Sequence, residues 1–266
     1  MDLRRYAAIY WMMVRNSLIR EMNFKANFIL WMVVELLWFL GQMVFVEVLF
    51  NYVSHIGDWT KWEVVALIGT HQLIGQIFQA FFYVNLANLP ELVRTGKLDL
   101  MLLLPVDAQF AVSTRQFGMD NIVNAFVGVG IVTFSLFQLH IAPHLYQIAL
   151  YGAGVALGVA VHYSVLFSLS TLSFWIVRAQ GVIYGYFNLF NIGRYPDVVF
   201  HGIFRRIFTT AVPIILVANV PCRTLLRASE NPARGLLSLL GATVFIVLAS
   251  RVFWRIALRR YSSASS

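Results

Sequence analysis

Charged residues are scarce in this sequence. Only 12% of its 266 residues are Asp, Glu, Lys or Arg, about half of the roughly 25% that is usual in soluble domains. No charged side chain occurs in the 57 residues between Asp120 and Arg178. A membrane-spanning helix needs only about 20 apolar residues, so this stretch holds two spans and a short hairpin. The sequence therefore excludes a soluble globular domain and predicts an all-α integral membrane protein.

Cysteine and recognisable reaction motifs are also lacking. Cys222 is the only cysteine, which excludes an internal disulfide and cysteine-rich metal sites. The sequence has no HExxH, no GxSxG and no metal-ligand spacing, so we predict neither catalytic residues nor a bound metal. A GxxxxGK[ST] loop is missing too, so the chain is not expected to bind ATP in the P-loop manner. We expect no enzyme and no cofactor in this chain by itself.

The first 25 residues are mixed and charged, so a cleavable signal peptide is not expected. Residues 1–25 place apolar side chains such as Leu3, Trp11 and Leu18 at helical spacing, with several arginines between them. This pattern predicts an amphipathic helix in the membrane interface, its cationic heads near anionic lipid. A plain basic segment before the first span is the alternative.

Long apolar runs make up most of the remaining chain, of which we expect residues 26–256 to be one six-span transmembrane domain and 257–266 a cytoplasmic tail. The spans are predicted at about 26–50, 62–86, 110–139, 145–177, 204–226 and 235–256. Residues 178–203 contain an apolar run too short to span, and we expect a helix or connector on the cytoplasmic side there. The fifth span contains Pro213 and Pro221, so residues 204–234 either span the membrane or re-enter it.

The formal net charge of +8 reflects the placement of lysine and arginine. With six spans, sixteen of these residues fall on the side of both termini and four on the other side. Cytoplasmic loops carry the excess of Lys and Arg, so we predict that both termini are cytoplasmic. The cationic residues lie at span ends without a stacked aromatic platform, which argues against nucleic acid as a partner.

Polar side chains inside spans are costly and are therefore candidates for function. Eight of them are predicted to line a translocation pathway: Glu35, Gln42, His71, Gln72, Gln76, Gln79, Asp120 and Asn124. Gln72, Gln76 and Gln79 share one face of the second span, and interhelical hydrogen bonding explains that stripe equally well. His162 alone is typical of a hydrogen-bonded core histidine. Gly154 and Gly158 have a small-xxx-small spacing that predicts close helix packing.

The loop after the second span, from Pro90 to Pro105, combines apolar and charged residues around Gly96. This pattern predicts a short, broken amphipathic helix at the membrane surface, suited to a protein contact. A lipid-bound linker fits the physics equally well. The residues predicted to make the protein contact are Glu91, Arg94, Gly96, Lys97, Leu98 and Asp99.

At this loop the sequence resembles the permease subunits of ABC-2 type transporters, in particular a group of bacterial permeases. The resemblance is carried by Thr95 through Asp99, by Leu104 through Val106, by Tyr195 and Pro196, and by Pro213 and Pro221. The amphipathic N-terminus fits as well, so the resemblance covers nearly the whole chain.

The resemblance implies a bacterial cytoplasmic (inner) membrane protein whose loop between spans 2 and 3 is a coupling helix. Two copies of an ABC ATPase subunit, holding ATP and Mg, would dock there, and a second permease chain, identical or paralogous, would complete the pathway. It also implies that the region between spans 5 and 6 re-enters. The many aromatic residues favour export of an amphiphilic or lipidic substrate. The alternative is a proton-coupled secondary transporter using Glu35, Asp120 and His71.

Overall fold

The computed structural model describes residues 3–23, 25–176, 179–226 and 232–261. Within these ranges every regular element is a helix and there is no strand. Among the described residues, five helical stretches are long and apolar enough to cross a membrane, and a bent helix pair supplies a sixth candidate. The predicted all-α integral membrane fold is confirmed.

The elements follow one another with short connections. Their bounds are α1 (Leu3–Asn23), α2 (Lys25–Tyr52), α3 (Lys61–Phe78), η1 (Gln79–Tyr83), α4 (Val84–Ala87), α5 (Leu89–Arg94), α6 (Leu98–Leu102), α7 (Ala108–Ser113), α8 (Met119–Gln138), α9 (Leu145–Thr171), η2 (Leu172–Phe174), α10 (Gln180–Phe190), η3 (Asn191–Arg194), η4 (Asp197–Val199), α11 (Gly202–Arg206), η5 (Ile207–Ala211), α12 (Ile214–Leu226) and α13 (Pro232–Arg260).

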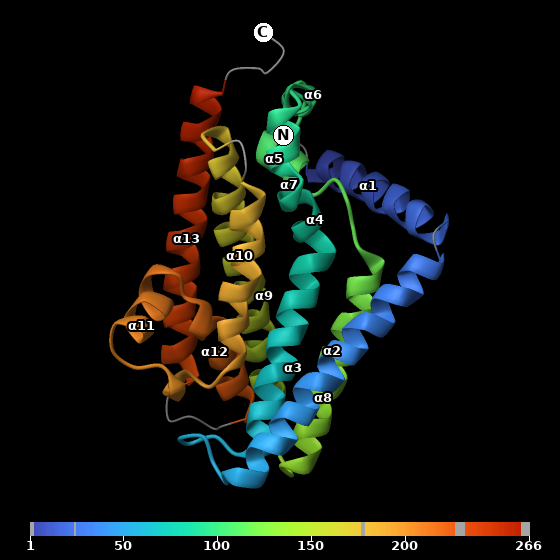
Figure 1. Cartoon of the computed structure of the whole chain (residues 1–266). Coiled ribbons are helices and arrows are strands. Elements are labelled where there is room, and N and C mark those ends of the chain that lie inside the picture. The colour runs from blue at the N-terminus through green and yellow to red at the C-terminus, as the bar shows by residue number, and fades with distance from the viewer. Residues whose placement is uncertain (1–2, 24, 177–178, 227–231, 262–266) are drawn as a thin grey trace.

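The bundle has two distinct ends. At the upper end of Figure 1 lie α1, the short helices α5 to α7 and the last turns of α13. At the lower end lie the loop after α2 and the turn between α8 and α9. The helix α1 crosses the upper end at a steep angle to α2, as an interfacial helix would. It is fixed there by Tyr6, whose ring packs edge-on against Phe110 at 4.9 Å, and by Ser17, whose hydroxyl accepts from the Phe117 amide at 3.1 Å.

The predicted third span began too early. Residues 108–113 form the separate helix α7, which begins directly after Asp107 because the Asp107 carboxylate caps it by accepting from the Phe110 amide. The chain between α7 and α8 is then held extended against the second span. Asn85 donates to the Gln116 carbonyl at 2.8 Å, and the Gly118 amide donates to the Ala80 carbonyl at 2.9 Å. These long-range hydrogen bonds delay the start of the spanning helix to Met119.

The segment after α9 also differs from its prediction. Instead of staying at the upper end, α10 runs down beside α9 into the bundle (Figure 1). Its 11 residues cover about 16 Å, roughly half of a hydrocarbon core. The chain then reaches the lower end, where Asp197 lies 2.6 Å from Arg223. The charge count had assigned Arg194, Arg205 and Arg206 to the side of the termini, and the structure moves them away from it.

Residues 204–226 do not form one straight span. The pieces 202–210 and 214–226 meet at an angle of 79°. Asp197 precedes this pair, Arg223 is near its end, and the two side chains form an ion pair, so the pair leaves and returns at the same end. This geometry is the re-entrant alternative. Arg227, which the charge count places on the side opposite the termini, lies outside the described residues.

Arg223 ties three segments together at the lower end. Its guanidinium bonds Asp58 of the α2–α3 loop at 2.8 Å and Asp197 at 2.6 Å. It also lies 4.8 Å from the ring centre of the buried Trp59. The α2–α3 loop, the segment after α10 and the re-entrant pair are therefore held as one unit.

Helices α3 and α8 cross in close contact at the bundle centre. A Cβ atom on Gly128 would come within 2.9 Å of the Leu73 amide nitrogen and 3.1 Å of the Gly69 carbonyl oxygen. Gly154 and Gly158 of α9 similarly face Pro221 and Val217 of α12. The spacing of these two glycines in the sequence predicts close helix packing. The helix that packs against them is α12, the second helix of the re-entrant pair.

We expect Gly128→Ala to lower the free energy of unfolding by about 1–3 kcal/mol, because the added methyl group meets backbone atoms that cannot rotate away. The matched control is Gly130→Ala, two residues further along the same helix, where a Cβ meets nothing within 4 Å. That change should leave stability unchanged or raise it by up to about 1 kcal/mol. Thermal melting of the two variants in one detergent measures the difference, and equal melting temperatures would contradict the close crossing.

Candidate functional site

A polar pocket of about 290 Å³ lies within the bundle, between α2, α3, α9 and α10. It is lined by Glu35, Trp38, Gln42, His71, Gln72, Gly75, Gln76, Phe78, Gln79, His162, Phe187, Phe190, Asn191 and Arg194. Polar groups from four elements thus converge at one place in a chain that is otherwise strongly apolar. Such convergence inside spans marks a binding or transport site.

The glutamine stripe of the second span supplies one wall of this pocket. Gln72 and Gln76 lie one turn apart on α3, and the apolar residues on the other faces of α3 pack into the core, including Leu67, Leu73 and Ile74. At Gln79 the helix widens into the π-helical turn η1. Insertions of this kind are frequent at functional sites because they re-aim side chains within a helix.

Hydrogen bonds hold several of the lining side chains in place. The Gln76 amide group donates to the Glu35 carboxylate at 3.2 Å, which joins α3 to α2. His71 Nε2 lies 3.0 Å from the Phe190 carbonyl oxygen, which joins α3 to the end of α10. His162 Nδ1 lies 2.8 Å from the Tyr186 hydroxyl, which joins α9 to α10. The pocket is therefore a built cavity with fixed walls.

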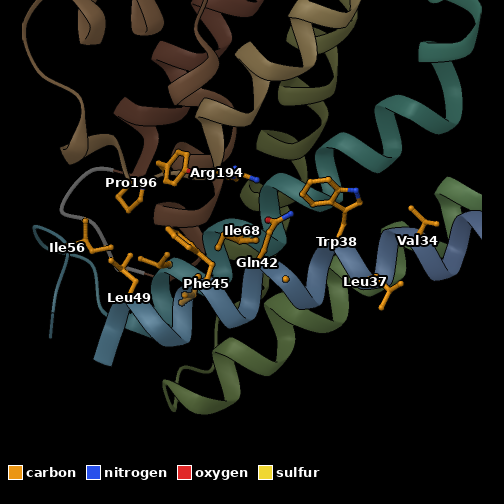
Figure 2. A pocket seen from close by; sticks show the side chains of 14 residues that line it. Val34, Leu37, Trp38, Gln42, Phe45, Leu49, Ile56, Ile68, Arg194 and Pro196 are labelled. Carbon is orange, nitrogen blue, oxygen red and sulfur yellow. Dashed lines mark hydrogen bonds between the residues drawn. The ribbon is translucent and has the colours of Figure 1, made fainter. Parts of the chain in front are cut away.

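An apolar groove of about 620 Å³ adjoins the pocket, between α2 and the chain around Tyr195 and Pro196. Figure 2 shows Trp38 and Gln42 rising from α2 toward Arg194, while Phe45 and Leu49 continue the groove toward the lower end. Trp38, Gln42 and Arg194 line both cavities. The two spaces are therefore neighbours that share these side chains as a common wall, one space apolar and the other polar.

Most of the predicted pathway residues are brought together. Glu35, Gln42, His71, Gln72, Gln76 and Gln79 all line the polar pocket. Asp120 and Asn124 do not line it. Asp120 lies near enough to Glu35 to interact electrostatically and accepts from Asn121 at 2.9 Å. Asn124 is buried on α8, which packs against α3.

Eight lining residues were not among the predicted pathway residues: Trp38, Gly75, Phe78, His162, Phe187, Phe190, Asn191 and Arg194. His162 is hydrogen-bonded and buried as expected of a core histidine, but it also faces the pocket. Asn191 and Arg194 were assigned to a cytoplasmic connector because the apolar run before them is short. One sequence signal could have indicated these two residues. The apolar run before them has few polar residues and ends in a cluster of polar residues, as expected at the inner tip of a half-span.

The loop between the second and third spans has a buried side and an exposed side. Leu98 is 0% exposed, so it anchors α6 in the protein instead of contacting a partner as predicted. Glu91 and Arg94 are paired with each other at 2.7 Å on the outer surface. Gly96 has φ +70°, a backbone conformation that favours glycine and turns α5 into α6. The most exposed apolar residues here are Leu100, at 66%, and Leu103, at 80%.

Asp107 connects this loop to the rest of the upper end. Its carboxylate accepts from Arg251 of α13 at 3.0 Å, and its amide donates to the Tyr6 hydroxyl of α1 at 3.0 Å. The hydrogen bond from Arg251 holds the pKa of Asp107 below its usual value. The carboxylate therefore stays charged at neutral pH, and the sequence offered no sign of this pairing across 144 residues.

The comparison with known families decides the class of this protein. A family model described as ABC-2 family transporter protein matches residues 36–265. The chain belongs to this family. The match begins within α2 and includes the loop with α5 and α6, the re-entrant pair, and every residue that lines the two cavities except Val34 and Glu35. A search of curated proteins found no match to this chain.

Membership confirms the resemblance seen in the sequence. The chain is a multi-pass membrane component of an ABC-2 type transporter, a permease, and the family implies association with an ABC ATPase subunit. It weighs against the secondary-transporter alternative, because that mechanism needs no ATPase. Within the permease, the apolar groove and the polar pocket are the cavities next to the candidate pathway residues.

Proposed function

We propose that this permease is the membrane-spanning subunit of an ATP-driven exporter of amphiphilic molecules. The observation that carries the proposal is that an apolar groove lies beside a polar pocket, with Trp38, Gln42 and Arg194 lining both. An amphiphile has one part that suits each space, since apolar walls bind its chain and convergent polar groups orient its head. A purely polar solute would leave the larger, apolar space without a matching partner.

The upper end supplies the contact with the ATPase subunit. Leu100 and Leu103 form an apolar tip beside the charged residues Glu91, Arg94 and Lys97, a combination that suits a protein interface with an apolar centre and a polar rim. The proposed assembly has two ATPase copies, which hold ATP and Mg, and a second permease chain, identical or paralogous. Both termini and this tip are then cytoplasmic, in the bacterial inner membrane.

A path of contacts runs from this tip to the pocket wall. Gln109 and Ser113 of α7 each lie 2.9 Å from the Tyr163 hydroxyl of α9. His162, the residue before Tyr163 on α9, lines the polar pocket. Movement of the tip by the ATPase subunit would reach the pocket through α7 and α9, which have this direct polar contact.

The test is reconstitution of the permease with its ATPase subunit in inverted vesicles. We expect a fluorescent lysophosphatidylethanolamine to accumulate inside when ATP and Mg are added, and not when a pH gradient alone is imposed. Accumulation driven by the pH gradient, and lost in Glu35→Gln or Asp120→Asn, would support the proton-coupled alternative instead. No complex surviving co-purification, together with no ATP-driven accumulation, would refute the proposal.

A further inference from the structure

Two buried acceptor atoms in the polar pocket have no hydrogen-bond donor. They are Gln76 Oε1 and His162 Nε2, both without a partner among the described residues. The side chains are 2% and 4% exposed, and both line the pocket. A buried polar atom without a partner costs about 1–3 kcal/mol, so such atoms point to a ligand that completes them.

The orientation of Gln76 is fixed by its neighbour. Its amide nitrogen donates to the Glu35 carboxylate, which can only accept when ionised. The amide cannot turn around without placing its oxygen against that carboxylate. Oε1 is therefore held on the other side of the amide group, where only a donor satisfies it.

The tautomer of His162 follows from the Tyr186 hydroxyl. This hydroxyl donates to the His162 carbonyl oxygen at 3.1 Å, and it lies 2.8 Å from Nδ1 of the same residue. The carbonyl oxygen can only accept, so we assign the single hydroxyl proton to it, and with this assignment Nδ1 carries a proton and donates to the hydroxyl oxygen. Nε2 of the neutral ring is then an acceptor.

We propose that the polar pocket selects amphiphiles whose head group donates hydrogen bonds, through hydroxyl or ammonium groups, to Gln76 Oε1 and His162 Nε2. This inference rests on the proposed function and specifies its substrate class. The Glu35 carboxylate adds a third acceptor at the same wall. Head groups that only accept, such as phosphocholine, leave both atoms unpaired and bind more weakly.

The experiment compares dodecyl maltoside, dodecylamine and dodecylphosphocholine, which share one alkyl chain and differ in the head group. Each is titrated calorimetrically into phosphatidylcholine nanodiscs that hold the full chain with its co-purifying subunits, without ATP, and empty nanodiscs are subtracted. We expect at least one donor head group to bind about tenfold more tightly than dodecylphosphocholine. Preference for maltoside assigns the site to hydroxyls, and preference for dodecylamine assigns it to ammonium groups.

Two variants test the assigned atoms. Gln76→Met removes one acceptor, and His162→Asn keeps a donor near the Nδ1 position while removing Nε2. Each should reduce the preference about fivefold, whereas Gln138→Met, at an exposed position of α8 that lines neither cavity, should keep it. Equal binding of all three amphiphiles overturns the inference, and so does a preference unchanged in both variants. Because binding is measured without ATP, failure of ATP-driven transport would leave this result standing, and equal binding would leave ATP-driven export standing.

Discussion

Leu103→Glu is expected to release the ATPase subunit from the permease. Leu103 ends α6 at the upper end and is 80% exposed, although its neighbour Leu98 is fully buried. In the proposed complex this leucine lies at the centre of the contact, and a carboxylate buried there without a partner costs several kcal/mol. We expect recovery of the ATPase subunit on an affinity-tagged permease to fall at least about tenfold, while melting of the permease itself stays unchanged.

The matched control is Leu145→Glu. Leu145 is 82% exposed, so the same change is made at the same exposure, but at the lower end where α9 begins. This variant should retain the ATPase subunit. If both variants lose it, the effect is a general loss of folding, and if both keep it, Leu103 is not part of the contact. Leu98→Ala serves a different purpose, since removal of a buried leucine should lower stability by about 2–5 kcal/mol.

Much of the membrane architecture was predictable because it depends on local composition. The uncharged stretch after Asp120 yields α8 and α9, separated by a short turn, as its length required. The start of α8 was not predictable, since hydrogen bonds from Asn85 and to Ala80, far away in the sequence, hold residues 114–118 out of the helix. Hydropathy depends only on local composition, so it cannot indicate hydrogen bonds between residues far apart in the sequence.

The candidate site was likewise predictable in one part and unpredictable in another. The glutamine stripe was visible because helical spacing places Gln72 and Gln76 on one face. The opposite wall was not, since α10 enters the bundle only part-way and fails any length criterion for a span. Arg194 reaches the pocket because it follows this half-span, and His162 lies on α9 where its ring contacts Tyr186 of the half-span. A helix that stops inside the membrane region is stable when its end is satisfied by protein, here by His71 against the Phe190 carbonyl.

Gly75→Phe is expected to block transport without disturbing the fold. Gly75 lines the polar pocket, and a Cβ atom placed there meets nothing within 4 Å. A phenylalanine ring can therefore enter the pocket and occupy the space between the glutamine stripe and α10, and it buries a large apolar surface where a polar head group should bind. We expect ATP-driven accumulation of the fluorescent lysolipid to fall at least about tenfold, with melting and recovery of the ATPase subunit unchanged.

The control for this variant is Gly152→Phe on α9. Gly152 is exposed and a Cβ there also meets nothing within 4 Å, but it lines neither cavity. Adding the same ring at the surface should leave transport within about twofold of the wild-type rate. Transport lost in both variants would trace the effect to aromatic insertion in general. Normal transport by Gly75→Phe would place the pathway outside this pocket, and the groove beside α2 would then have to carry the substrate without it.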